Sequence, residues 1–185
     1  FEVLDPEALE VRCHSSPNGC GEGPAYVAIW TTTPWTLPAN LAVCLHPAFD
    51  YVAYPAKGRL RIVARGLVES FLAAIGEPEF DDAKVVARWK GKDLEGLSYH
   101  HPLADKICPV VLGEHVTLEA GTGCVHTAPG HGAEDFYIGQ KYGLETFNPV
   151  ADDGTFIPDE VGQWPHHYVC KACGTGLKYT DGKHL

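Results

Sequence analysis

The chain contains no methionine and no long hydrophobic run. A helix that crosses a membrane needs about 20 consecutive apolar residues, and a secretory signal peptide also needs an apolar stretch. The sequence therefore predicts a soluble protein without a membrane partner. Because it begins at Phe1 and has no methionine, we expect it to be a piece of the interior of a larger protein.

Basic residues are also scarce. Lys and Arg number 14 against 24 Asp and Glu, which gives a formal net charge of -10. A protein that binds nucleic acid through its own charge needs clustered Lys and Arg against the phosphates. The densest basic stretch, residues 84–92, is modest and interrupted. If this chain handles a nucleic acid, another part of a larger assembly must supply most of the affinity.

Cysteine occurs seven times, an odd number without the density of a secreted disulfide scaffold. Cys44, Cys108 and Cys124 stand in apolar, strand-like segments, so we expect them to be buried small hydrophobic residues. Cys170 and Cys173 differ from these, because they form a Cys-x-x-Cys pair followed by glycine. That spacing lets two thiolates bind one Zn²⁺.

The Cys170/Cys173 pair supplies only half of a four-ligand zinc site. Cys13, His14 and Cys20 could complete it within the chain, although their spacing is looser than usual. Alternatively, the partner cysteines lie outside this sequence. The residues leave both interpretations open.

Twenty glycines and fourteen prolines favour turns and short strands. Apolar, β-branched runs predict strands at 26–33, 41–45, 51–54, 60–64, 83–89, 107–112 and 121–126. Helical spacing predicts two modest helices at 66–75 and 131–142, each ended by a glycine. The strands do not alternate with helices as in a doubly wound parallel sheet. The predicted class is α+β, β-dominated and barrel-like.

The apolar periodicity stops near residue 161. We therefore predict a main domain over 1–161 and a Cys- and His-containing stem segment over 162–185. At 185 residues the chain is long enough for one core and a small appendage.

The first candidate site is the sequence WTTTPWTLPAN, which runs from Trp30 to Asn40. Its three threonines end the predicted strand 26–33. Side chains alternate along a strand, so Thr31 and Thr33 should share one face while Thr32 takes the other. Threonines also favour strands for packing reasons alone, so this stretch does not by itself establish a functional site.

The second candidate site is GTGCVHTAPGHGAEDF, residues 121–136. Two histidines, His126 and His131, stand among glycines that leave the backbone open to a ligand. Asp135 lies near the start of a predicted helix and, when ionised, can bind an ammonium group, although helix capping is the ordinary role of such a residue. The three could instead bind a catalytic Zn²⁺. The proline and glycine between the histidines exclude the one-face helix that many such pairs use.

Together the two motifs resemble the editing domain of isoleucyl-tRNA synthetases, the large insertion called connective peptide 1 in their catalytic core. Residues 31–40 and 121–135 match in order and spacing, and 139–145 also fit. The related valine and leucine domains share the Thr-Thr-x-Pro and Gly-Thr-Gly themes, but they carry an acidic residue where Trp35 stands. The resemblance covers residues 26–160 and does not extend to the two ends.

The resemblance implies a mixed β-barrel with a few short helices that hydrolyses valine from the 3′ adenosine of isoleucine tRNA. One missing methylene changes binding by only ~1–3 kcal/mol, a magnitude established on the isoleucine enzymes themselves. A second pocket must therefore hydrolyse what is small enough to enter. The implied parent is a cytoplasmic, ATP-using isoleucine–tRNA ligase, and its catalytic core and tRNA are the partners. Editing needs no cofactor, and Cys170/Cys173 would be half of a zinc-binding stem.

The resemblance also implies residue roles. Asp135 would hold the substrate's α-ammonium group. Thr31 and Thr33 would hydrogen-bond the substrate or the attacking water, facing Asp135 across the pocket while Thr32 points away. His126 would set the size limit.

The remaining members of the implied substrate-binding set are Trp30 as a wall, Asn40 as a support of the threonine loop or a contact of the adenosine, Thr32, and His131. No residue is an obvious general base, so catalysis is expected from a positioned water, with help from the ribose hydroxyl of the tRNA.

Two rival functions remain. The pocket could bind an amino acid or aminoacyl-adenylate without turnover, or the His/Asp cluster could be a metallohydrolase. A deacylation assay with mischarged tRNA separates turnover from binding.

Overall fold

The computed structural model describes residues 2–3, 25–157, 168–169 and 176–177. The strands are β1 (Glu2–Val3), β2 (Ala25–Val27), β3 (Ala42–Leu45), β4 (Asp50–Ala56), β5 (Arg59–Ala64), β6 (Ala87–Lys90), β7 (Ser98–His100), β8 (Ile107–Leu112), β9 (Cys124–Thr127), β10 (Tyr168–Val169) and β11 (Gly176–Leu177). The α-helices are α2 (Val68–Ala74) and α3 (Ala133–Tyr142). The 3-10 helices are η1 (Pro34–Ala39), η2 (Arg65–Leu67), η3 (Asp82–Lys84) and η4 (Gly91–Leu94).

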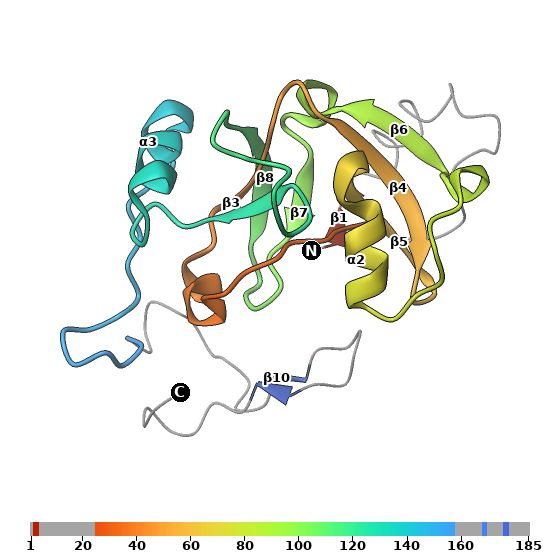
Figure 1. Ribbon diagram of the computed structural model, residues 1–185. Coiled ribbons are helices and arrows are strands. Elements are labelled where there is room, and N and C mark those ends of the chain that lie inside the picture. Colours follow the sequence, from red (N-terminus) through yellow and green to blue (C-terminus); the bar gives the residue numbers. More distant parts are fainter. Residues whose placement is uncertain (1, 4–24, 158–167, 170–175, 178–185) are drawn as a thin grey trace.

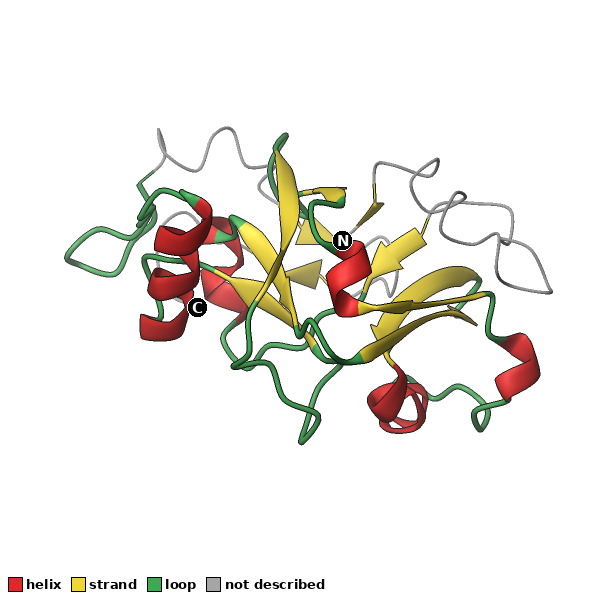
Figure 2. Ribbon diagram, turned by 90° about the horizontal axis from the view of Figure 1, so that it is seen from above, coloured by secondary structure: helices red, strands yellow, loops and turns green. Residues whose placement is uncertain are grey.

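Nine strands form one mixed sheet in the order β6-β4-β5-β2-β1-β7-β8-β3-β9, and β10 and β11 form a separate antiparallel pair. The β2·β5 and β3·β8 pairs are parallel, and the others in the large sheet are antiparallel. Figure 2 shows the strands in the middle of the molecule with helical segments at both ends. The predicted α+β, β-dominated class is confirmed.

The predicted barrel is not closed. Closure requires the two edge strands to pair, and within the described part of the chain β6 and β9 remain the edges of the sheet. Side-chain and loop contacts bridge the opening instead. The Ala64 amide donates to the Thr122 carbonyl at 2.8 Å, and the Tyr51 hydroxyl donates to the Gly123 carbonyl at 2.7 Å. The segment before β9 is thereby held against β4 and β5.

The hairpin formed by β4 and β5 has the turn that the sequence predicts. Lys57 and Gly58 both have positive φ, 48° and 68°, which suits a two-residue turn that matches strand twist. The register runs from Tyr51 opposite Ala64 to Ala56 opposite Arg59. The hairpin predicted around residues 56–59 is therefore confirmed.

Two groups of buried side chains hold the sheet and helices together. The larger draws on strands across the whole sheet, and α2 contributes Val68 and Leu72 to it. Figure 1 shows α2 beside β4 and β5. The smaller contains Ala42 and Cys44 of β3, and α3 packs against it through Ile138 and other residues. Each helix therefore covers a different end of the sheet.

The three cysteines predicted to be buried are buried: Cys44, Cys108 and Cys124. Burial raises the pKa of each thiol, to about 12 for Cys44. They act as small hydrophobic residues and not as nucleophiles.

Both predicted helices exist with nearly the predicted limits. α2 is followed by Gly76 at φ 67°, and α3 is followed by Gly143, also at φ 67°. Glycine adopts this left-handed conformation without a Cβ clash, so it ends the helices where the sequence indicated.

The predicted strand 26–33 is wrong in its extent, because β2 ends at Val27. The Ala28 amide still bonds to the Ile62 carbonyl at 3.1 Å, but the chain then leaves the sheet. The Thr33 amide donates to the Thr31 hydroxyl at 3.0 Å. A short side chain that bonds the nearby backbone competes with the strand ladder, and η1 then starts at Pro34.

Two other strands start later than predicted. β6 begins at Ala87 because the preceding residues form η3, whose start is capped by the Asp81 side chain. β9 begins at Cys124 because Gly121 and Gly123 have φ of 81° and 71°, which extended strands do not use.

The predictions for the two ends of the chain concern residues that lie largely outside the described ranges. This applies to the zinc-ligand candidates Cys170, Cys173, Cys13, His14 and Cys20, and the boundary near residue 161 stays a prediction. Within the described ranges, no group of three or more His, Cys, Asp or Glu side chains could hold a metal ion. No helix of the described chain has the length and apolarity to span a membrane.

Candidate functional site

The two sequence motifs meet where β3 and β9 pair. His126 of β9 lies opposite Val43 of β3, and the Leu41 amide bonds to the Thr127 carbonyl at 3.0 Å. This pairing places the end of η1 beside the middle of β9. Residues 86 and 90 positions apart are therefore in contact, and they form the candidate site.

Asn40 is the buried centre of this junction, with only 1% of its surface exposed. Its Nδ2 donates to the Ala42 carbonyl at 2.8 Å and lies 2.8 Å from His126 Nδ1. The Tyr99 hydroxyl donates to its Oδ1 at 2.5 Å. All of these partners lie within the protein, so the Asn40 side chain is buried and fully hydrogen-bonded.

His126 connects Asn40 to the threonine loop. Its Nε2 lies 3.0 Å from Thr36 Oγ1, so both ring nitrogens have partners. Burial lowers the pKa of His126 to about 4, with smaller contributions from the two histidines at 101 and 131. The ring is therefore neutral near pH 7. This occupancy, together with the absence of a metal-holding group in the described residues, argues against the His126/His131/Asp135 metal triad.

The threonine hydroxyls lie in a compact turn. Thr31 Oγ1 and Thr33 Oγ1 are 3.3 Å apart, and Thr33 Oγ1 is 3.4 Å from Thr36 Oγ1. The Thr36 hydroxyl also donates to the Thr33 carbonyl at 2.8 Å. Thr32 is exposed. Thr31 and Thr33 thus come together through a turn and not through strand alternation.

Asp135 lies in the first turn of α3, and its Oδ2 accepts the Ala128 amide at 2.9 Å. Burial raises the pKa of this carboxyl, while the Ala128 amide and the nearby His115 and His131 oppose that rise. The side chain anchors the loop that joins β9 to α3. A carboxylate has further acceptor positions for a cation.

His131 lies in that same loop, and its backbone amide bonds to the Ala128 carbonyl at 2.8 Å. Burial lowers the pKa of its ring. Its Nε2 is buried without a hydrogen-bond partner among the residues that the structure describes, and so is the Nε2 of His115.

Two tryptophans flank the threonines with large exposed surfaces, 61% for Trp30 and 49% for Trp35. A Cβ on Gly121 would lie 3.1 Å from the Trp30 Cβ, so the glycine lets Trp30 approach the second motif. Trp30 therefore lies beside Gly121 of the second motif, and its role as a wall stays a prediction.

Sequence reasoning gave no role to Thr36 or Tyr99. Thr36 stood inside the quoted motif, whereas Tyr99 comes from β7 and no local signal marks it. His101 is also buried, and both of its ring nitrogens have partners within the protein. Its Nδ1 accepts the amides of residues 103 and 104, and its Nε2 lies 3.1 Å from the Leu37 carbonyl.

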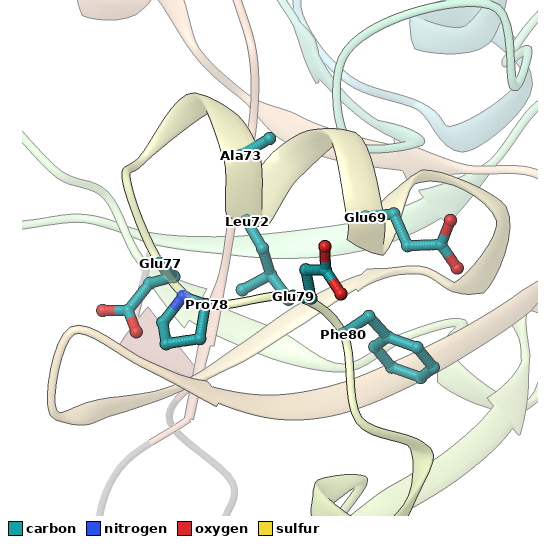
Figure 3. Close-up of a pocket in the computed structure, with 7 residues that line it drawn as sticks. All are labelled: Glu69, Leu72, Ala73, Glu77, Pro78, Glu79 and Phe80. Carbon is teal, nitrogen blue, oxygen red and sulfur yellow. The ribbon is translucent and has the colours of Figure 1, made fainter.

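A cavity of about 350 Å³ lies elsewhere, beside α2. Its lining, shown in Figure 3, comes from α2 and the segment that follows it: Glu69, Leu72, Ala73, Glu77, Pro78, Glu79 and Phe80. Glu77 accepts the Lys57 amide at 2.9 Å, which explains its position structurally. The cavity holds no member of the two motifs, and the convergent polar groups that mark a reaction site lie at η1 and β9.

The comparisons with known proteins identify the family of the chain. The family model described as "Leucyl-tRNA synthetase, editing domain" matches residues 61–161. The isoleucine–tRNA ligase of Thioalkalivibrio sulfidiphilus is 52% identical over 158 residues, which is 85% of this chain and 16% of that protein. The isoleucine–tRNA ligase of Symbiobacterium thermophilum is 48% identical over 181 residues, covering 98% of this chain and 18% of that protein.

Solved structures show the same fold at low identity. The P. knowlesi cytosolic leucyl-tRNA synthetase editing domain superimposes with a TM-score of 0.62 at 16% identity, over 78% of this chain and 64% of that one. GlLeuRS-CP1 gives 0.61 at 20% identity, over 79% and 57%.

The chain belongs to the family of aminoacyl-tRNA synthetase editing domains. The curated relatives at about half identity are isoleucine–tRNA ligases, so the resemblance found in the sequence is confirmed, and with it the proofreading class of function. The chain spans only 16% of the length of the first of these relatives.

Proposed function

We propose that this chain hydrolyses valine from misacylated isoleucine tRNA, as the editing domain of an isoleucine–tRNA ligase. The observation that carries this proposal is the contact of His126 with both Asn40 and Thr36, which joins the threonine loop to the His/Asp loop. The relatives bear the name of the ligase, and the double-sieve argument supplies the reason for a second, hydrolytic site.

His126 sets the size limit in this proposal. A side chain that excludes one methylene must not move away from the larger substrate. Hydrogen bonds at both ring nitrogens and burial to 9% exposure hold the imidazole in place. An imidazole held in this way excludes the larger isoleucine side chain by steric clash and admits valine.

Asp135 holds the substrate's α-ammonium group, and Thr31 and Thr33 hold the water or the ester oxygens. Trp30, Thr32 and His131 complete the binding surface. With no general base assigned, the rate enhancement comes from holding the water and ester in line, which can supply several kcal/mol of the barrier. A ribose hydroxyl of the tRNA assists. That Thr31 and Thr33 face Asp135 stays part of this proposal.

The tRNA and the catalytic core of the parent enzyme are the proposed partners, in the cytoplasm. With a net charge of -10, the chain needs the core and its tRNA contacts for most of the affinity. The deciding experiment therefore uses a full-length isoleucine–tRNA ligase that carries this chain as its editing domain.

In that enzyme we expect rapid hydrolysis of isoleucine tRNA that carries valine, and slow hydrolysis of isoleucine tRNA that carries isoleucine. His126→Ala should allow hydrolysis of isoleucyl-tRNA. If this variant still discriminates between valyl-tRNA and isoleucyl-tRNA, His126 does not set the size limit. If the wild-type enzyme deacylates neither substrate, the proposed hydrolytic function is wrong.

The second candidate function is a binding module for an amino acid or adenylate. It is favoured only if valyl-tRNA binds without turnover. Chelator treatment tests the metallohydrolase alternative, and full activity after metal removal would exclude it.

A further inference from the structure

His101, which directly follows β7, has one possible arrangement of ring protons. The amides of Leu103 and Ala104 donate to its Nδ1 at 3.0 and 2.9 Å, and because an amide only donates, Nδ1 carries no proton. Burial lowers the pKa of His101 to about 4, so the ring is neutral at pH 7 and its single proton is on Nε2. The Leu37 carbonyl lies 3.1 Å from Nε2 and can only accept. His101 therefore donates to Leu37.

The Leu37 carbonyl belongs to η1, a helix with little support of its own. η1 is a six-residue 3-10 helix, longer than such helices usually run. Pro34 and Pro38 within it have no amide hydrogen, and the side chain at its start makes no capping hydrogen bond. The Asn40 amide donates to the Leu37 carbonyl at 3.0 Å. The bond from His101, 64 positions away along the chain, adds a tertiary anchor at the same carbonyl.

The end of η1 is held from two strands, β7 and β9, which lie on opposite sides of β8 and β3 in the sheet. From β7, the Tyr99 hydroxyl donates to Asn40 Oδ1 at 2.5 Å. His101, two residues further on, donates to the Leu37 carbonyl. From β9, Nδ1 of His126 lies 2.8 Å from Asn40 Nδ2. Buried side chains of the sheet therefore set where η1 lies relative to β9.

The anchor matters because candidate reaction groups lie at the start of η1. Thr31 and Thr33 precede the helix directly, and Trp35 lies in its first turn. A shift of η1 would move these side chains relative to His126, whereas the pairing of β9 with β3 would stay intact. A small misplacement of groups that position a reactant lowers the rate of its reaction.

We propose that His101 is a positioning residue for the editing reaction. Its bond to the Leu37 carbonyl holds η1, and with η1 the threonine loop, in place relative to His126. His101 is 5% exposed and its ring bonds to groups of the protein, so it does not touch the substrate. The effect on rate rests on the hydrolytic function proposed above, whereas the anchoring of η1 does not.

Two substitutions separate the two contacts of the ring. In His101→Asn the side-chain oxygen takes the place of Nδ1, so the amides of Leu103 and Ala104 keep an acceptor, but nothing reaches the Leu37 carbonyl. In His101→Gln the side-chain amide nitrogen takes the place of Nε2 and still donates to Leu37, but the two amides lose their acceptor. His101→Gln should therefore be the less stable variant in urea unfolding, and His101→Asn the less active one.

Rates are measured in the full-length enzyme on isoleucine tRNA that carries valine. His101→Asn should lower the deacylation kcat about 10-fold with KM within about twofold, the size expected for the loss of one hydrogen bond. His101→Gln should keep kcat within about threefold in spite of its lower stability. His46→Asn is the matched control, because Nδ1 of His46 also accepts a backbone amide, that of Ala48 at 3.1 Å, at the far end of β3 from η1. Its kcat should stay within about twofold of the wild type.

Hydrogen exchange of the Asn40 amide tests the anchor in this chain without any reaction. This amide bonds to the Leu37 carbonyl, and its exchange rate is compared with those of the β5 amides, which report unfolding of the sheet. At pH 7 the ratio of the two rates should rise about 10-fold in His101→Asn and less than about threefold in His101→Gln.

Wild-type kcat in His101→Asn, or a loss confined to KM, would overturn the positioning role. A kcat in His101→Gln as low as that of His101→Asn would assign the loss to reduced stability and would overturn the role as well. An unchanged exchange ratio in His101→Asn would show that His101 does not anchor η1. If the wild type deacylates nothing, the proposed function fails, and the exchange ratio still decides whether the anchor exists.

Discussion

The two ends of the hydrogen-bond chain around His126 differ sharply in exposure. At the inner end, Asn40 is 1% exposed and Tyr99 is fully buried. At the outer end Thr33 is exposed, and Trp35 beside it is 49% exposed. The inner end satisfies its polar atoms within the protein, whereas the outer end is open to solvent. The comparison indicates that the interior fixes the geometry which the open surface then offers to a ligand.

This contrast separates two kinds of variant. A change at the inner end leaves buried polar atoms without partners, so it should reduce stability and activity together. A change at the outer end should alter activity alone. The following experiments test that division, from the largest expected effect to the smallest.

Acid should destabilise the inner end most. Burial lowers the pKa of His101 and of His126 to about 4 from 6.5, so the unfolded chain binds more protons between these values. Their stabilisation is complete above pH 6.5 and is lost as pH falls toward 4. At pH 5 the loss should be about 2 kcal/mol for each histidine relative to pH 7.

Urea unfolding at pH 7 and pH 5 measures this loss. The raised pKa of Asp135 acts with the opposite sign and offsets part of it. His101→Gln, which cannot titrate, should remove about half of the pH dependence. An unchanged pH dependence in this variant would contradict the assignment to the buried histidines.

Asn40→Ala should lower the free energy of unfolding by about 3 kcal/mol, because it leaves His126 Nδ1, the Ala42 carbonyl and the Tyr99 hydroxyl without this partner. Urea unfolding measures the loss. Asn148→Ala removes an exposed asparagine that accepts a single backbone amide at 3.1 Å, and it should cost less than about 1 kcal/mol. Similar losses in both variants would show that Asn40 contributes no more to stability than an exposed asparagine.

Asp135→Asn keeps an oxygen for the Ala128 amide but removes the negative charge. Loss of a charged hydrogen bond to the substrate ammonium should lower kcat/KM for valyl-tRNA by at least about 10-fold, with a small change in stability. The neighbouring Glu134→Gln, an exposed carboxyl on the same helix turn, should leave kcat/KM within about twofold. A loss as large in Glu134→Gln would show a general charge effect instead.

Thr32→Ala should have the smallest effect. Its side chain is exposed, so the free energy of unfolding should change by less than about 0.5 kcal/mol. We expect at most a threefold change in kcat/KM (~0.6 kcal/mol), far below that of Asp135→Asn. A destabilisation comparable with that of Asn40→Ala would contradict the prediction that only changes at the inner end reduce stability.

Local patterns predicted much of the fold. The Lys57–Gly58 hairpin, the two glycine-ended helices and the three buried cysteines follow from short-range chemistry, and each is present. The predicted strand 26–33 was too long, because the Thr31 hydroxyl accepts a hydrogen bond from the Thr33 amide and the chain turns there. Propensity scales favour threonine in strands and do not see this competition.

The candidate site divides in the same way. The motifs alone suggested Thr31, Thr33, His126 and Asp135 as candidate site residues, because residue type and order carry the family resemblance. They could not identify Tyr99, which is 59 positions from Asn40 and reaches it only through the sheet order β7-β8-β3. Nor could they orient Asn40, whose amide is set by a carbonyl and a hydroxyl from different parts of the chain.

The sequence by itself determined the family, the two site motifs and the ends of the helices, since each depends on neighbouring residues. Only the tertiary structure decided that the barrel stays open, that His126 is neutral, and which groups bond to its two ring nitrogens. Those properties depend on burial and on hydrogen-bond partners brought together by strand pairing, and no stretch of sequence contains both members of such a pair.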